Sequence, residues 1–245
     1  MRALAAIVRR EFVSYFVSPL GYVILTAFLL VSGTVFVLLV NALNSPETPP
    51  TAMMSLYFTN VFQWIFLMIV SSIISMRVLS EERKSGSIES LLTAPVSEAT
   101  VVTGKFVGAW CFFLFLFLPT LVYPLLLLRV SRLDPGPVLS GYLGIALVGA
   151  LFISAGTFAS ALTKNQIVAA ILAFAIVLGS FLLGIFRDFL PSANLRDAFS
   201  YLNILEQMDD FSRGIVDTRR LVFVGSTVVF FLFLATRTLE VNKGK

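Results

Sequence analysis

Long apolar runs separated by short polar stretches dominate the pattern of this chain. A membrane-spanning helix needs about 20 largely uncharged residues, and six runs reach or approach that length without a charge near the middle. They cover residues 20–40, 57–76, 106–128, 140–162, 166–186 and 221–236. The last run is short, so we expect Arg219, Arg220 and Arg237 to extend from its ends to the membrane surface. The pattern predicts an all-α, polytopic membrane protein, with six transmembrane helices in a single domain over residues 1–245.

The composition agrees with this prediction and excludes several kinds of site. Hydrophobic residues make up 58% of the 245 residues, more than a soluble domain of this length can bury, so the lipid bilayer must cover much of the chain. There is no His, the commonest general base and metal ligand, and the single Cys111 cannot form an internal disulfide. We therefore expect no catalytic, cofactor or metal site. The net charge of +4 is typical of basic flanks of membrane helices rather than of nucleic-acid binding.

The distribution of basic residues predicts how the spans are oriented. Lys and Arg are enriched on the cytoplasmic side of membrane proteins. With the N-terminus inside, that side holds Arg2, Arg9, Arg10, Arg77, Arg83, Lys84, Lys105, Lys164, Arg237, Lys243 and Lys245, and the other side holds Arg129, Arg132, Arg187, Arg196, Arg213, Arg219 and Arg220. We therefore expect both termini in the cytoplasm, although the long basic segment 187–220 counts against this orientation.

Two further segments have helical spacing but are not expected to span. Within residues 1–18, the apolar positions share one face and the basic positions share the other. The apolar face holds Leu4, Ile7, Val8, Phe12 and Tyr15. This predicts a helix lying in the membrane interface, with a plain basic flank of the first span as the alternative. Segment 187–220 is too polar to span, and we expect either one or two short helices that dip into the outer leaflet or a small capping hairpin on the outer face.

The charged stretch 80–95, between the second and third runs, is expected to bind a partner. Ser80 or Ser85 can cap a short helix. Ile88, Leu91 and Leu92 then share one face, and a proline at position 95 ends the helix. An apolar ridge on a water-facing loop is typical of a partner surface. Packing of this ridge on the chain's own helix ends is the alternative.

The order of residues in this stretch resembles a pattern found in the permease subunits of type-2 ABC transporters. There, Glu-Arg-x-x-Gly-Thr/Ser-x-Glu-x-Leu-Leu-x-x-Pro follows the second span. The matching residues here are Glu82, Arg83, Gly86, Ser87, Glu89, Leu91, Leu92 and Pro95. In that family the segment is the coupling helix, which docks in a groove of the ATP-hydrolysing subunit. The resemblance therefore implies an ATPase-coupling role for residues 80–95.

Two other segments extend the resemblance over essentially the whole chain. The turn between the fourth and fifth runs, with Thr163, Lys164, Asn165 and Gln166, resembles the family's second cytoplasmic loop. The stretch 211–219, the final run and Leu239-Glu240 are similar to the subgroup associated with bacterial gliding motility. The chain lacks the His that often precedes the Phe-x-Arg-Gly segment in that subgroup. The resemblance implies a bacterial inner-membrane location.

The resemblance also implies which partners the chain has. Family permeases work as pairs, so we expect a second copy or a related permease, together with two ATPase subunits and an envelope accessory protein. Gly104-Lys105 is followed by Phe106, without the Ser or Thr of a Walker A loop. ATP and magnesium are therefore expected on the partner ATPase and not on this chain.

The polar residues inside the predicted spans have two interpretations. Asn60, Gln63, Ser71, Ser72 and Ser75 all belong to the second run. Such side chains join helices by hydrogen bonds, or they line a transport path. The spacing alone favours the joining role and leaves the path open.

Glycines and prolines give further expectations about two other runs. Gly144, Gly149 and Gly156 in the fourth run predict a face that allows close helix packing. Pro119 and Pro124 in the third run predict kinks, which either serve as a hinge or simply fit the packing.

Three classes of function remain to be compared. The pattern and the resemblance favour the permease subunit of an ATP-driven exporter. The alternative is a membrane component of a motility or envelope machine that transmits force or a signal without exporting a cargo. An intramembrane serine protease would need a His base, which this chain lacks.

Overall fold

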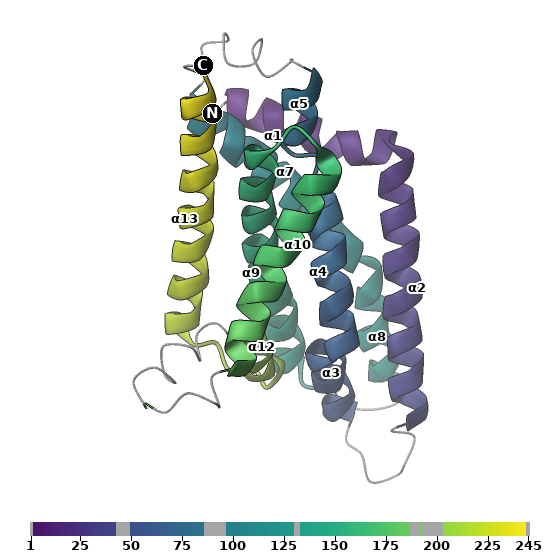
Figure 1. Cartoon of the computed structure of the whole chain (residues 1–245). Helices are drawn as coiled ribbons and strands as arrows, with labels where there is room; N and C mark the ends of the chain where they lie inside the picture. Colours follow the sequence, from purple (N-terminus) through teal and green to yellow (C-terminus); the bar gives the residue numbers. More distant parts are fainter. Residues whose placement is uncertain are drawn as a thin grey trace.

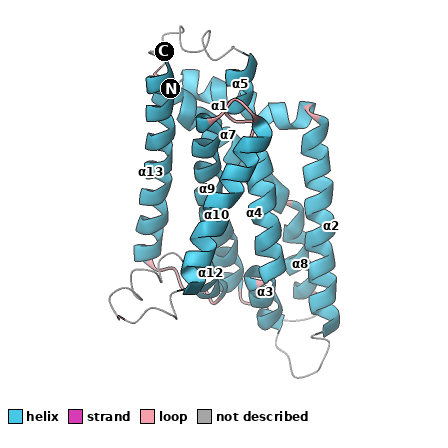
Figure 2. Ribbon diagram, viewed as in Figure 1, coloured by secondary structure: helices cyan, strands magenta, loops and turns pink. Residues whose placement is uncertain are grey.

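The computed structural model describes residues 2–42, 50–85, 97–129, 133–186, 192 and 203–243, and within these ranges the chain is helical without a strand (Figure 2). The helices are α1 Arg2–Val17, α2 Pro19–Ala42, α3 Pro50–Thr59, α4 Val61–Ser75, α5 Ser80–Ser85, α7 Glu98–Phe117, the 3-10 helix η1 Pro119–Leu121, α8 Val122–Leu128, α9 Pro135–Leu162, α10 Gln166–Phe186, α12 Ile204–Ser212 and α13 Thr218–Lys243. The all-α prediction is confirmed.

Helix α9 forms the centre of the bundle. It contacts α13, α10, α12, α4 and α7, and the long helices run side by side along one direction while α1 lies across one end (Figure 1). We call this the α1 end. The first and last helices both reach it, so the two chain ends lie on the same side of the bundle. Which side of a membrane this is stays a prediction.

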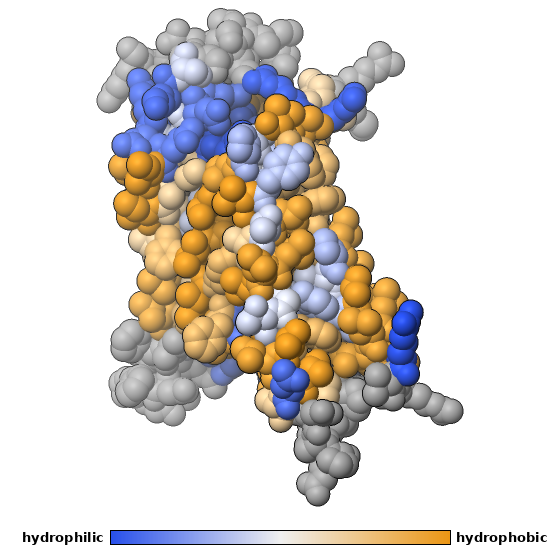
Figure 3. All heavy atoms as spheres, turned by 90° about the vertical axis from the view of Figure 1, so that its right-hand side faces the viewer, coloured by the Kyte–Doolittle hydropathy of each residue, from blue (hydrophilic) through white to orange (hydrophobic). Residues whose placement is uncertain are grey.

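Five helices are long and apolar enough to cross a membrane. They are Pro19–Ala42, Val61–Ser85, Glu98–Leu128, Pro135–Leu162 and Thr218–Val241. On the face that Figure 3 shows, apolar residues cover the middle of the molecule and hydrophilic residues gather at the α1 end. Helix α10 has the bounds expected for the fifth run, and its described part Gln166–Leu182 is a shorter apolar helix than these five. A sixth span therefore stays a prediction.

The second run is not the continuous helix over 57–76 that the sequence predicts. It breaks at Asn60, whose side-chain oxygen accepts a hydrogen bond from the Gln63 amide at 3.2 Å and so caps α4. The break leaves the Phe58 carbonyl without a helical partner. Trp64 Nε1 donates to that carbonyl at 2.7 Å, so the apolar bundle tolerates the interruption.

Of the two kinks expected in the third run, Pro119 produces one. The helix tightens there into η1, because Pro119 has no N–H to donate. Thr120 Oγ1 donates to the Phe117 carbonyl at 2.8 Å, and Tyr142 donates to the Thr120 carbonyl at 3.0 Å. Pro124 lies in the first turn of α8, where a missing N–H costs little, and the helix continues through it.

Two other helices extend beyond the runs that predict them. The last run, predicted as 221–236, lies in a helix of 26 residues that continues past Arg237 to Lys243. The fourth run, predicted from 140, begins at Pro135 after Asp134 caps the helix by accepting from the Gly136 amide at 3.0 Å. In both cases the helix extends into polar sequence that a hydropathy pattern leaves out.

The close-packing face predicted on α9 is confirmed. A Cβ on Gly149 would lie 2.2 Å from the Phe113 ring, and one on Gly156 would lie 1.9 Å from Ser75 Oγ. A Cβ on Gly144 would meet Met208 of α12 at 2.8 Å. The glycines let three neighbouring helices approach α9 closely.

Candidate functional site

The candidate site lies at the α1 end, where α5 meets α1, α7 and the turn between α9 and α10. Of the predicted coupling residues, Glu82 and Arg83 belong to α5. The remaining six, Gly86, Ser87, Glu89, Leu91, Leu92 and Pro95, lie outside the described residues. The geometry below therefore concerns the beginning of the predicted coupling segment.

Ser160, near the end of α9, holds the turn that leads from α4 into α5. Its hydroxyl accepts from the backbone amides of Leu79 and Ser80, each at 2.9 Å, and donates to the Met76 carbonyl at 3.0 Å. The two amide contacts are buried and the Met76 contact is partly buried; an unsatisfied buried backbone group costs about 1–3 kcal/mol. One hydroxyl thus fixes the entry of α5 onto α9.

Arg83 makes the second connection between α5 and α9. Its guanidinium donates to the Ala161 carbonyl, one residue after Ser160. This carbonyl belongs to the last turn of α9, where helical acceptors have no partner of their own. The side chain of Arg83 thereby places α5 beside the predicted second cytoplasmic loop.

That loop is a tight turn with its own capping bonds. The Asn165 amide donates to Thr163 Oγ1 at 3.1 Å, and the Ile167 amide donates to Asn165 Oδ1 at 2.9 Å. Lys164 and Asn165 are exposed, whereas Gln166 is half-buried. The structure therefore brings the two predicted cytoplasmic segments together through the last residues of α9.

A buried charge cluster connects the other side of α5 to α1 and α7. Lys105 Nζ lies 3.1 Å from Glu11 Oε2 and 3.1 Å from Glu82 Oε1, and it donates to the Val78 carbonyl at 2.7 Å. The side chains of Lys105, Glu11 and Glu82 are only 6%, 11% and 9% exposed. Arg10 also reaches Glu82 at 3.5 Å but is 71% exposed, so it contributes little.

Burial sets the electrostatics of this cluster. Loss of water around Glu11 raises the pKa of its carboxyl, and the nearby Lys105 lowers it by less. Burial likewise raises the pKa of the Tyr15 hydroxyl well above its ordinary value. That hydroxyl donates to the Ile74 carbonyl at 2.8 Å, while the Arg77 guanidinium lies over the Tyr15 ring at 5.1 Å.

Glycines in α7 allow α1 to approach closely enough for the cluster to form. A Cβ on Gly104 would lie 2.8 Å from Ile7, and one on Gly108 would lie 2.6 Å from Glu11 Cβ. These glycines are one turn apart on either side of Lys105. The apolar face of α1 therefore packs in good part on α7, and a position of α1 in the membrane interface stays a prediction.

A polar cleft of about 220 Å³ opens at the cluster. Charged residues of α1, the α4–α5 turn, α5 and α7 line it, and the Oε2 atom of Glu82 is buried there without a hydrogen-bond partner in the described part of the chain. No group of three His, Cys, Asp or Glu that could hold a metal ion occurs among the described residues. The cleft is therefore lined by both acidic and basic groups.

The comparison with known families agrees with this geometry. The sequence model of a family described as "ABC-2 family transporter protein" matches residues 40–204, two thirds of the chain, including α4, α5, the α9–α10 turn and Lys105. The chain belongs to the ABC-2 transporter family. Membership makes it a multi-pass membrane protein, the permease component of an ABC transporter, and implies an ABC ATPase subunit as partner. No curated protein matches the chain.

In this ABC-2 family chain, the polar residues of the second run take up positions inside the bundle. Ser71 and Ser72 donate to the Met68 carbonyl at 3.0 and 2.7 Å, and Ser75 donates to the Ser71 carbonyl at 2.7 Å. All three are buried, with Ser75 against Gly156. This geometry favours packing between helices. Gln63 is buried too, and the nitrogen and oxygen of its side-chain carboxamide have no hydrogen-bond partner among the described residues.

Three residues of the site were missed by sequence reasoning. Lys105 is considered there as a cytoplasmic charge and as part of an incomplete Walker A pattern, and neither Ser160 nor Glu11 is assigned to the site. Glu11 did carry a signal, because positions 4, 8, 11 and 15 fall on one helical stripe and Glu11 is the only charge on it. A lone acid on an apolar stripe requires a buried partner.

Proposed function

We propose that this ABC-2 permease component is the membrane subunit of an ATP-driven exporter, and that residues 80–95 receive the movement of the ATPase. The observation that carries the proposal is the attachment of α5. Arg83 holds it to α9, and the Lys105–Glu82 pair holds it to α7 and, through Glu11, to α1. A push on a segment bonded to three other helices moves those helices with it.

The proposal includes a complete assembly. Two permease chains, identical or related, act with two ATPase subunits that bind ATP and magnesium. The α1 end faces the cytoplasm of a bacterial cell and the opposite end faces the envelope, with the turn over Thr163–Gln166 as a second contact for the ATPase. Support comes from the family match, from both described chain ends lying at the α1 end, and from the two cytoplasmic segments meeting there.

The first test measures the assembly itself. The tagged full-length chain is purified from its host in nanodiscs and its complex is weighed by native mass spectrometry. The proposal expects an ATPase subunit at one copy per permease, with two of each. A permease that carries no ATPase, even after mild crosslinking, would exclude ATPase coupling.

The second test changes the coupling segment. Leu91→Asp and Leu92→Asp, introduced together, should abolish co-purification of the ATPase and stimulation of its ATP hydrolysis by the permease. Ala99→Asp is the matched control, because it adds an acid to an exposed site in the first turn of α7, where helices accept one. Normal ATPase binding by the double variant would contradict the proposed docking.

A third measurement separates export from force transmission. The membrane lipids and envelope fractions of cells with and without the complex are compared for material whose transfer depends on ATP. A transferred compound supports export. ATP hydrolysis stimulated by the permease without any transfer would instead support the motility or envelope machine related to the gliding-motility subgroup.

A further inference from the structure

A groove runs along the bundle between α10 and α13, with α9 as its floor and α12 across its end. Its inner part is a cavity of about 120 Å³ whose walls include Val177 of α10 and Phe223, Thr227 and Phe231 of α13. Thr227 and Ser180 donate their hydroxyl hydrogens to carbonyls of their own helices, at 2.8 and 2.7 Å. They therefore present mainly carbon to the cavity, which suits an apolar occupant.

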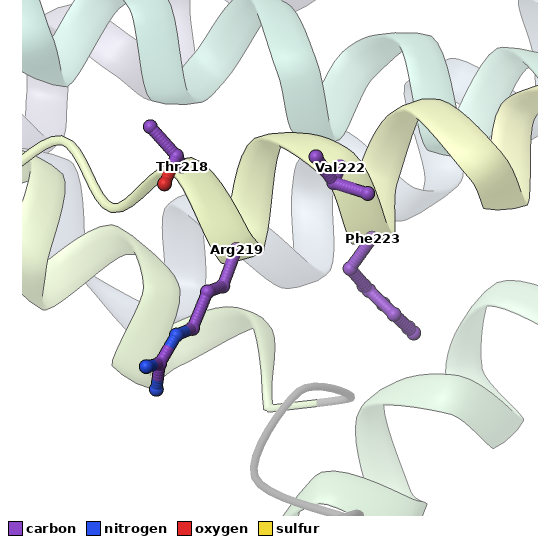
Figure 4. Close-up of a pocket in the computed structure, with 4 residues that line it drawn as sticks. All are labelled: Thr218, Arg219, Val222 and Phe223. Carbon is purple, nitrogen blue, oxygen red and sulfur yellow. The ribbon is translucent and has the colours of Figure 1, made fainter.

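A second hollow begins where the first one ends, at the start of α13. Thr218, Arg219, Val222 and Phe223 line it (Figure 4). The side chains of Arg219 and Phe223 point to the same side of α13, one turn apart (Figure 4). Phe223 lines both hollows, so they form one groove with a cationic mouth and an apolar interior.

Arg219 is available for an anion at this mouth. Its two basic neighbours are occupied, because Arg220 pairs with Asp210 and Arg213 pairs with Asp209. The Arg219 guanidinium is exposed and forms no ion pair within the described part of the chain. A guanidinium matches the geometry of a phosphate group well, since it can donate two parallel hydrogen bonds.

The length of the groove fits one leaflet of a bilayer. Arg219 and Phe231 are twelve residues apart, which is about 18 Å along a helix. Half the hydrocarbon thickness of a bilayer is about 15 Å. The inner cavity is also far smaller than the roughly 300–1,000 Å³ of a pocket for a small molecule, so a single flexible chain fits it better than a compact ligand.

We propose that the groove between α10 and α13 binds one phospholipid of the leaflet at the α12 end. Its phosphate contacts Arg219, and one acyl chain runs past Phe223 into the cavity beside Val177 and Thr227. This site is independent of ATPase coupling. Only 11% of the apolar, membrane-spanning part of α13 is buried within the chain. The bound phospholipid covers part of the exposed side of this helix.

The experiment uses the full-length chain in phosphatidylcholine nanodiscs that contain a small fraction of a photoreactive phosphatidylcholine. The photoreactive group sits at the end of one acyl chain, and adducts are located by mass spectrometry after irradiation. We expect adducts at Val177, Thr227 or Phe231 several-fold above those at the exposed α2 residues Val23 and Leu30. Arg219→Gln should reduce the groove adducts several-fold, whereas Arg213→Gln, an exposed arginine at the same end, should not.

Three comparisons guard the interpretation. A diacylglycerol with the same photoreactive chain but no phosphate should label the groove weakly, and excess inorganic phosphate should not displace the phospholipid. Thr227→Phe should fill the cavity and remove the adducts there; if it fails to fold, the exposed Arg219 variant still decides. The proposal would be overturned if all exposed helices were labelled evenly, if both probes labelled the groove equally, or if phosphate displaced the phospholipid. It would also be overturned if two Val222→Cys chains formed a disulfide and no lipid adducts appeared.

Discussion

Lys105 Nζ in α7 lies 3.1 Å from Glu82 Oε1 in α5, and both side chains are more than nine-tenths buried. This pair joins the start of the predicted coupling segment to the third span. Glu11 completes the cluster from α1 at the same distance from Lys105. A single lysine therefore compensates two buried carboxylates on two other helices, and the arrangement of the α1 end depends on it.

Replacement of Lys105 by Met should destabilise the protein strongly. It keeps much of the side-chain length but leaves Glu11 and Glu82 without their buried cation, and Glu82 keeps only the largely exposed Arg10. Breaking a buried ion pair in this way typically costs about 3–5 kcal/mol. We expect a clear fall in the thermal unfolding midpoint in nanodiscs. Arg10→Met is the control, because Arg10 contacts Glu82 from a largely exposed position and should cost about 0–1 kcal/mol. Equal effects of the two variants would show that Lys105 does not hold the cluster.

The stability of the protein should depend on pH through Glu11. Its pKa is raised above the ordinary value of 4.5 in the folded chain, so the folded state binds this proton more tightly than the unfolded state. The contribution of Glu11 to the free energy of unfolding is therefore largest at acidic pH and is lost as pH rises through the raised pKa. Glu11→Gln does not titrate. The difference in unfolding midpoint, wild type minus variant, should fall as the pH rises above 4.5; a difference that is constant or increases with pH would contradict this.

A methyl group on Gly156 should separate α9 from α4. The Cβ of Gly156→Ala would lie 1.9 Å from Ser75 Oγ and 2.4 Å from Ser75 Cβ. Such overpacking typically destabilises a protein by about 1–3 kcal/mol. We expect a lower unfolding midpoint, with partial recovery when Ser75→Gly is added. Gly179→Ala is the matched control in a neighbouring helix, because nothing lies within 4 Å of its Cβ; it should be neutral or stabilising. A loss of stability confined to Gly179→Ala would refute the assignment of the close contact.

Removal of the Ser160 hydroxyl should release the turn that precedes α5. Ser160→Ala deprives the buried Leu79 and Ser80 amides of their acceptor, at a cost of about 1–3 kcal/mol for each amide that stays unsatisfied. Faster hydrogen exchange at these amides should accompany this loss, which mass spectrometry of the 76–85 peptide can detect. Ser154→Ala serves as the control, since that buried hydroxyl bonds only within its own helix. Unchanged exchange in Ser160→Ala would mean that other contacts hold the turn.

Regular apolar helices were predictable, and interruptions and polar contacts were not. The predicted bounds of the fifth run agree with those of α10, because polar residues bound an uninterrupted apolar pattern there. The last run is predicted too short because the pattern stops at Arg237, whereas the helix continues with Arg237 paired to Glu240 at 2.7 Å. The break at Asn60 depends on the Trp64 side chain satisfying a carbonyl, a contact that hydropathy does not encode.

The candidate site was predictable only in part for the same reason. The motif at Glu82 and Arg83 is visible in the sequence, because it depends on local spacing. Its attachment to Ser160, Ala161 and Lys105 joins residues that are far apart along the chain. Such contacts are decided by how the helices pack, and the only advance sign was the isolated acid at position 11.

The separation of Glu11 and Lys105 along the sequence also sets an order of events during synthesis. The two residues are 94 positions apart, so at about 5–20 residues per second the ribosome adds Lys105 roughly 5–20 seconds after Glu11. Until then the carboxylate of Glu11 has no buried cation to meet, and α1 lacks the glycine surface of α7 on which it packs. The first helix of the chain is therefore among the elements that must wait longest for their final position.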